Sequence, residues 1–240
     1  MVATPTMSNA NETPSALPSW LEGKKLNKIE QNKAAKDGLL VGSEIETFAK
    51  LGWENVDETD LQLRLKWYGM FWRPKTPGLF MMRLRVPNGV ISAEQLRVVG
   101  NIVARYGSNG SADITTRQNI QMRGILLEDL PEILGQLKAV GLTTIQSAFD
   151  NPRNVTGNPI AGIDPLEIVD TRPYTQELEN FLTSNHQGNP EFSNLPRKWN
   201  TAVAGHATTS CSTTTSPSTP LSATARWALA SGSAAFSPPR

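Results

Sequence analysis

The chain has 240 residues, of which 38% are hydrophobic, so its length allows one large domain or two small ones with a buried core. A formal net charge of +1 argues against a nucleic-acid-binding protein, and no apolar run approaches the roughly 20 residues that span a bilayer. The one cysteine, Cys211, and two histidines argue against a disulfide, a cysteine-only metal site or zinc, so we expect a soluble protein of the cytoplasm.

The first part of the chain is predicted to progress from a disordered leader to paired strands. Residues 1–24 are rich in Pro, Ser, Thr and Asn and lack both the apolar content to fold and the features of a signal or transit peptide. Short helices that wrap around a core are predicted over 20–50. Alternating apolar and polar side chains predict a half-buried strand over 60–67 and a second strand over 79–86, which ends at the turn 87–89.

The next segment has the clearest periodicity. Ser92 and the glutamine three places later form a capping box, which predicts a helix that ends at Gly107. Two further strands are predicted over 112–116 and 119–126, and a second amphipathic helix over 130–140. This order predicts an α+β fold, in which helices pack on one face of a small antiparallel sheet.

The chain changes character after the second helix. Residues 150–173 are rich in Asn, Pro, Gly and Asp without periodicity, which is typical of a functional loop, and a short helix is predicted over 176–183. In the tail, 206–240, 15 of 35 residues are Ser or Thr and none is Asp, Glu or Lys. Such a tail can be a disordered linker. We favour out-of-frame translation, because residues 207–218 can be re-read two nucleotides along as a string with globular apolar spacing; sequencing the coding DNA across Gly205 tests this.

Basic residues recur in four segments beside turn-forming sequences. Alternation places Arg83 and Arg85 on one face of a strand. Each segment alone is as well explained by turns, caps and surface charges. Together they favour a pocket for a small anion and an acidic cofactor, because a guanidinium offers a planar fork that matches a carboxylate. The candidate residues are Arg83; Arg117, Gln118, Asn119, Gln121 and Arg123 around a bend between two strands; Arg153 in the long loop; and Lys198 with Asn200.

These segments carry a resemblance to a known family. From about residue 25 to 205 the chain resembles the ferredoxin-dependent nitrite reductases, within the siroheme nitrite/sulfite reductase superfamily. The motifs that carry the resemblance are Met-Met-Arg83-Leu-Arg-Val-Pro-Asn-Gly, Thr-Thr-Arg117-Gln-Asn-Ile-Gln, Asp-Asn-Pro-Arg153-Asn-Val, Gly-Ile-Asp164-Pro, Asp-Thr-Arg172-Pro-Tyr and Leu-Pro-Arg197-Lys198-Trp-Asn200.

The resemblance implies a fold and an activity. It implies a ferredoxin-like half-domain with an N-terminal helical wrap over 25–149 and the start of a siroheme and 4Fe-4S domain over 150–205. Full-length relatives are then monomers that reduce nitrite to ammonium at siroheme with electrons from reduced ferredoxin. The implied anion-side, catalytic residues are Arg83, Arg153, Lys198 and Asn200; the implied siroheme-binding residues are Arg117, Gln118, Asn119, Gln121 and Arg123.

One departure from the family pattern limits this expectation. The family anchors its cluster and heme iron through four cysteines downstream of Lys198, and Cys211 matches none of them. Iron–sulfur clusters need thiolates, so we expect a truncated chain that is inactive alone. The alternatives are a fragment of a sulfite reductase, which Asn200 argues against because sulfite reductases tend to carry lysine there, and a non-catalytic ferredoxin-like binding module.

Overall fold

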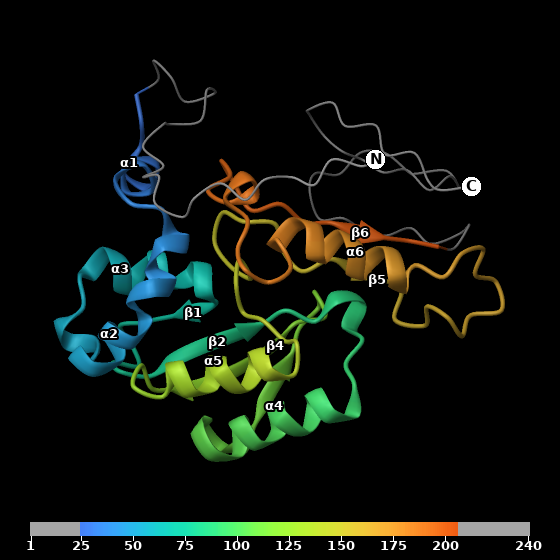
Figure 1. Cartoon of the computed structure of the whole chain (residues 1–240), viewed down its shortest axis with the longest axis horizontal. Coiled ribbons are helices and arrows are strands. Elements are labelled where there is room, and N and C mark those ends of the chain that lie inside the picture. Colours follow the sequence, from blue (N-terminus) through green and yellow to red (C-terminus); the bar gives the residue numbers. More distant parts are fainter. Residues whose placement is uncertain (1–24, 206–240) are drawn as a thin grey trace, which may run out of the picture.

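The computed structural model of the chain describes residues 25–205 (Figure 1). The predicted leader 1–24 and the predicted tail 206–240, with Cys211, lie outside the described residues. Within 25–205, none of the helices has the length and apolar content needed to cross a membrane. The α-helices are α1 (Lys28–Ala35), α2 (Ile45–Leu51), α3 (Glu58–Gln62), α4 (Ala93–Tyr106), α5 (Leu130–Ala139) and α6 (Arg172–Thr183), and the strands are β1 (Met70–Phe71), β2 (Phe80–Leu84), β3 (Ala112–Ile114), β4 (Ile120–Ile125), β5 (Thr156–Gly157) and β6 (Ala202–Val203).

An antiparallel sheet with strand order β1-β2-β4-β3 forms the centre of the fold. One face of the sheet buries Met82, Leu84 and Met122 against apolar residues of α4 and α5, such as Ile102 and Ile133. Each fully buried side chain of this kind stabilises the fold by about 1.5–3 kcal/mol relative to its exposed state. The predicted α+β arrangement, with helices on one face of a small antiparallel sheet, is confirmed.

The two central helices have the ends that the sequence predicts. Gln95 N donates to Ser92 Oγ at 3.1 Å and Ser92 N donates to Gln95 Oε1 at 2.9 Å, so both bonds of the capping box are present. Helix α4 ends before Gly107, and α5 ends two residues before Gly141, whose φ is +72°. Positive φ favours glycine because it has no Cβ.

The prediction of a strand over 60–67 is wrong. Residues of this segment form α3 and a 3-10 helix, Arg64–Tyr68. Asp57 caps α3 by accepting hydrogen bonds from two backbone N–H groups of its first turn. Leu61 and Leu65, both buried, are one helical turn apart. Over only eight residues, alternating apolar side chains can also have the spacing of a helix, and the cap at Asp57 favours the helix.

Further element boundaries differ from the prediction. Helix α6 starts at Arg172, four residues before the predicted start, and holds a proline in its first turn, where the missing N–H costs nothing. Strands β2, β3 and β4 are shorter than the predicted 79–86, 112–116 and 119–126. The helices predicted within 20–50 are present as α1, α2 and a 3-10 helix, Gly38–Glu44.

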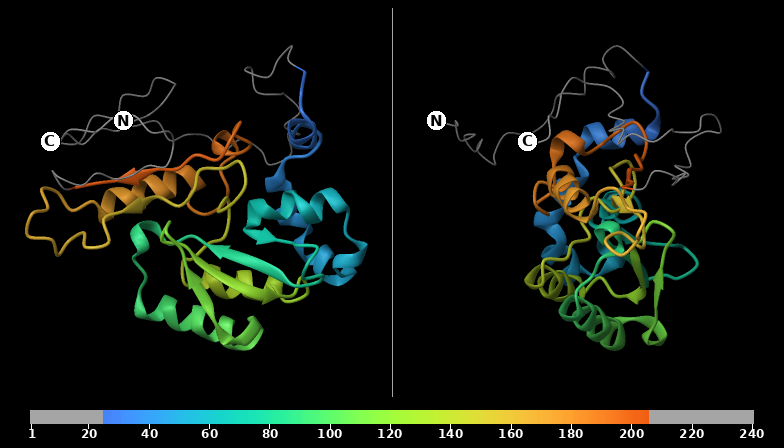
Figure 2. Two further views of the ribbon diagram at one scale, coloured as in Figure 1. Left: turned by 180° about the vertical axis from the view of Figure 1, so that it is seen from behind. Right: turned by 90° about the vertical axis from the view of Figure 1, so that its right-hand side faces the viewer.

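A second layer follows the sheet in the chain. Residues 150–171 have little regular structure, as predicted, apart from β5, which pairs in parallel with β6. Figures 1 and 2 show α6, β5 and β6 on the opposite side of the molecule from α4 and α5. The face of the sheet that α4 and α5 leave uncovered therefore turns toward this second layer.

Candidate functional site: a cavity lined by four cations

A cavity of about 210 Å³ lies over the sheet face opposite α4 and α5. Four of its side chains are cations and none is a carboxylate. The lining residues are Phe71, Arg83, Thr115, Arg117, Asn119, Gln121, Arg153 and Lys198. The structure thus brings together side chains from β1, β2, β4, the β3–β4 turn, the long loop and the segment before β6.

Arg83 enters the cavity from β2. Its guanidinium carbon lies 4.7 Å from the centre of the Phe71 ring, a cation–π distance. Gln121 is opposite Arg83 on β4; with its amide oxygen toward Arg83, it accepts hydrogen bonds from Nε and Nη2, each 3.0 Å long. Burial, and then the charge of Arg117, lower the pKa of Arg83 from its ordinary value. These contacts hold the guanidinium without neutralising it.

The turn between β3 and β4 presents Arg117. Thr115 Oγ1 accepts from the backbone N–H groups of Arg117 at 3.3 Å and of Asn119 at 3.2 Å, which fixes the turn. Gln118 adopts a φ of +57° at the bend. Nε of Arg117 donates to Asn200 Oδ1 at 3.2 Å, so Asn200 orients Arg117 from the segment before β6.

Arg153 is a half-buried cation of the cavity. Its Nη1 donates to the carbonyl of Ser147 at 2.9 Å, while its buried Nε has no acceptor among the described residues. Burial, followed by the charges of Arg83, Arg117 and Arg85, lowers its pKa to about 10, and Asp150 opposes the shift. A buried, unpaired N–H donor beside like charges is the environment in which a bound anion is stabilised most.

Lys198 completes the set from an exposed position. The charge of Arg117 is the main cause that lowers its pKa, followed by desolvation and the charges of Arg153, Arg197 and Arg83. Since every neighbouring charge is positive, folding brings these cations together against their repulsion. An anion in the cavity relieves that repulsion.

This charge arrangement predicts how anion binding changes with pH. The folded-state pKa of Lys198 is lowered, so its positive charge is complete at neutral pH and is lost as pH rises through the lowered value. The pKa of Arg153 is lowered to about 10, so its charge is also lost as pH rises through that value. The affinity of the chain for sulfate should therefore fall as pH rises from neutral, measured by titration calorimetry. Lys198→Met should remove the contribution of Lys198 to this fall; an affinity independent of pH up to about 10 contradicts the assignment.

Three of the predicted residues do not line the cavity. Gln118 instead bonds the backbone of Gly157, with its amide nitrogen donating to the carbonyl at 2.9 Å and its oxygen accepting from the N–H at 3.0 Å. The side chain of Arg123 is 52% exposed and pairs with Asp113 at 2.7 Å. Asn200 touches the cavity only through Arg117. Sequence reasoning missed Phe71, because its strand β1 has two residues and no detectable pattern.

The described residues fit the two implied cofactors differently. Four cations, one of which has a buried N–H donor without an acceptor among the described residues, suit the acidic substituents of a tetrapyrrole such as siroheme. No group of three or more His, Cys, Asp or Glu side chains within residues 25–205 is placed to hold a metal ion. The 240-residue sequence contains one cysteine, which cannot supply the thiolates of a 4Fe-4S cluster.

The fold and the cavity agree with two family models. Residues 73–140 match the nitrite/sulfite reductase ferredoxin-like half domain, and residues 148–216 match the nitrite and sulphite reductase 4Fe-4S domain. The chain belongs to the nitrite and sulfite reductase family.

Within this family the chain is similar to ferredoxin–nitrite reductases. It is 55% identical over 180 residues to that of Leptolyngbya laminosa and 56% identical over 181 residues to that of Synechococcus elongatus. Each match covers 75% of this chain and 35% of the relative, so the chain spans about a third of the length of these relatives. A solved structure of Mycobacterium tuberculosis NirA matches with a TM-score of 0.68 and 35% identity, over 76% of this chain and 36% of that one.

Proposed function

We propose that this chain supplies the anion-binding part of a ferredoxin–nitrite reductase, an enzyme of nitrate assimilation that reduces nitrite to ammonium. The single observation that carries the proposal is the cavity of four cations without a lining carboxylate. The names of relatives that are 55% and 56% identical support nitrite as the substrate and reduced ferredoxin as the electron donor. We place the protein in the cytoplasm, as its composition predicts.

Each cavity residue has a defined task in this proposal. When bound, siroheme supplies the iron at which electrons reach the substrate. Arg117, Asn119 and Gln121 would hold its acidic substituents, with Gln118 fixing the turn that carries them. Arg83 and Arg153 would bind and orient the oxyanion, because a cation in a water-excluded site stabilises negative charge far better than in water.

Lys198 is the proposed proton donor. Its Nζ carries a proton that the surrounding positive charges make easier to release, since its pKa is lowered. Transfer of that proton to an oxygen of the bound oxyanion, with a second proton from solvent, would allow the oxygen to leave as water. Solvent can then reprotonate Nζ, because Lys198 is exposed.

The 240-residue chain alone should be inactive. One cysteine cannot hold a 4Fe-4S cluster, so electrons have no route to the site. Purified from cells that make siroheme, the chain should show no siroheme absorbance and no nitrite turnover with reduced ferredoxin. A coloured, active preparation contradicts this part of the proposal.

A chimera tests the function itself. Residues 25–205 replace the matching segment of the Synechococcus elongatus relative, which provides the remainder of the enzyme. The chimera should reduce nitrite with ferredoxin as donor. A chimera that binds siroheme and prefers sulfite would assign the chain to the sulfite reductases instead, and a folded chimera without either activity would leave only a binding module.

A further inference from the structure

A buried ion pair lies directly behind the cavity. Arg85 follows Arg83 by two residues and is 1% exposed, and Glu179 of α6 is 0% exposed. Nε and Nη2 of Arg85 donate to the two carboxylate oxygens of Glu179, the second at 2.9 Å. Buried ion pairs are costly to desolvate and are often no more stabilising than apolar residues in their place. The geometry around this pair indicates a task other than stability.

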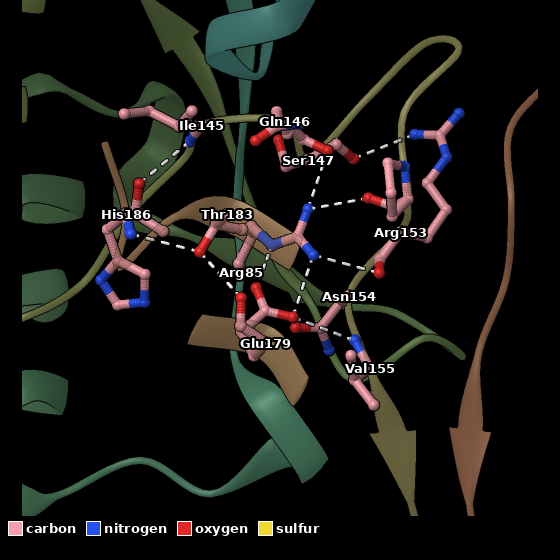
Figure 3. A network of polar contacts seen from close by, with 12 residues as sticks. Arg85, Ile145, Gln146, Ser147, Arg153, Asn154, Val155, Glu179, Thr183 and His186 are labelled. Atoms are coloured by element: carbon pink, nitrogen blue, oxygen red, sulfur yellow. Dashed lines mark hydrogen bonds and ion pairs between the residues drawn. The ribbon is translucent and has the colours of Figure 1, made fainter. Parts of the chain in front are cut away.

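All five N–H donors of Arg85 have acceptors. Two go to Glu179, and Glu179 also accepts from the backbone N–H of Val155 at 3.3 Å. Figure 3 shows the guanidinium of Arg85 between Glu179, Gln146 and Arg153. The other three donors bind backbone carbonyls, those of Gln146 at 2.8 Å, Pro152 at 2.9 Å and Arg153 at 3.1 Å. The ion pair thereby fixes the backbone at both ends of the segment 146–155.

That segment carries Arg153, the cavity cation whose buried Nε lacks an acceptor among the described residues. While the carbonyl of Arg153 binds Arg85, its side chain runs back to the carbonyl of Ser147, as Figure 3 shows. The same Ser147 carbonyl accepts from Nη1 of Arg83 at 3.5 Å, and the Ser147 hydroxyl donates to the carbonyl of Arg83 at 3.0 Å. The guanidinium groups of Arg83 and Arg153 therefore bind the same carbonyl, that of Ser147. Arg85 fixes the adjoining backbone by its bond to the carbonyl of Gln146.

The segment 146–155 also binds the stretch of chain before β6 that carries Lys198. The backbone N–H of Arg153 donates to the carbonyl of Trp199 at 2.7 Å, and the N–H of Trp199 donates to the carbonyl of Asn151 at 3.3 Å. Lys198 and Arg153 thus come from two backbones that lie side by side in a parallel bridge. A shift of one would shift the other.

We propose that Arg85 and Glu179 are positioning residues, which hold Arg153 and Lys198 at the separation at which both contact one anion. This inference rests on the proposed function of the cavity. Like charges in the cavity repel one another, so flexible backbones would let them move apart. The Arg85–Glu179 pair holds the backbone in place through its hydrogen bonds. It adds no net charge near the cavity, because the two side chains have opposite charges.

The test separates positioning from stability. The double variant Arg85→Met/Glu179→Met removes the pair without leaving a lone buried charge. Its matched control is Asp60→Met/Arg64→Met, which removes another buried pair, 2.6 Å long, remote from the cavity. For each folded 240-residue chain we would measure the urea midpoint and the affinity for inorganic sulfate by NMR shifts.

The expected result is a loss of affinity at Arg85 and Glu179 alone. Loss of groups that orient ligating side chains weakens metal sites about 10–100-fold, and we expect a similar factor for sulfate here. The Asp60/Arg64 control should bind sulfate like the unmodified chain, whatever its midpoint. Glu179→Gln leaves Arg85 buried without its counter-charge and turns an N–H donor toward it, so the sulfate affinity should fall in this variant as well. Unchanged sulfate affinity in Arg85→Met/Glu179→Met overturns the positioning role.

A measurement without substitutions covers the case in which that variant does not fold. Coupling between two sites is reciprocal, so saturating sulfate should slow hydrogen exchange at the backbone N–H of Val155, which binds Glu179. Unchanged exchange at Val155 with an occupied cavity refutes the coupling. If sulfate does not bind the cavity of the unmodified chain at all, the proposed function fails, and this outcome is distinct from failure of the clamp.

Discussion

Replacement of Arg153 by methionine in the nitrite-reducing chimera should lower kcat by about 10²–10³-fold, equivalent to about 2.7–4 kcal/mol of barrier. Arg153 lines the cavity, and its buried Nε is an N–H donor without an acceptor among the described residues. That donor contributes most when negative charge develops on the substrate oxygen. Methionine keeps most of the volume, so the steady-state rate of nitrite reduction measures the lost charge and not a collapsed site.

Stability of the same variant provides the contrast. The pKa of Arg153 is lowered by burial and by the charges of Arg83 and Arg117, so its positive charge works against folding. Arg153→Met should leave the urea midpoint unchanged or raise it. Arg105→Met is the matched control, since Arg105 is an exposed cation of α4 remote from the cavity. Equal activities of the two variants would show that Arg153 has no part in binding or catalysis.

Replacement of Asp60 by asparagine should destabilise the chain by about 3–5 kcal/mol, because it leaves Arg64 buried without its counter-charge. Asp60 accepts from Arg64 at 2.6 Å and from Lys36 at 2.8 Å, and it joins α3 to the residues after α1. Burial alone would raise the pKa of Asp60, but the bonds from Lys36 and Arg64 outweigh it and lower the pKa. Its contribution to stability is therefore complete at neutral pH and is lost as pH falls through the lowered value. Urea unfolding at two pH values measures both effects.

An exposed ion pair supplies the control for Asp60. Asp113 pairs with Arg123, and both side chains are about half exposed, 53% and 52%. Surface pairs contribute about 0–1 kcal/mol, so Asp113→Asn should shift the free energy of unfolding by no more than that. If Asp60→Asn lowers the free energy of unfolding by as little as Asp113→Asn does, the Asp60–Arg64 pair behaves like a solvent-exposed pair.

The elements predicted correctly are those whose local signals agree. Helix α4 has helical apolar spacing, a capping box at Ser92 and a glycine at its end, so tertiary packing had nothing to override. The segment 60–67 has leucines at every second position, and these also satisfy the i, i+4 spacing of a helix. There the cap at Asp57 and the contacts of Asp60 with Lys36 and Arg64 favour the helix. Asp57 lies before the predicted strand and Lys36 lies 24 residues before Asp60, so the alternating pattern does not include them.

The candidate site shows the same division. Arg83 and Arg85 have the same strand spacing, yet Arg83 lines the cavity and Arg85 is paired in the interior. Nothing local separates them, because the partner of Arg85 is Glu179, 94 residues later. Gln118 and Arg123 belong to the same polar motif as Arg117, but a positive φ at Gln118 and an exposed strand face at Arg123 turn them elsewhere.

A sulfate titration of the ¹⁵N-labelled, unmodified chain tests the central claim most directly. The account predicts saturable shifts that cluster at the backbone amides of Thr115, Asn119, Gln121 and Arg153 and that vanish in Arg153→Met. Shifts that do not saturate and that are scattered over exposed cations such as Arg105 would contradict this account. The four cations of the cavity would then be surface charges without a common ligand.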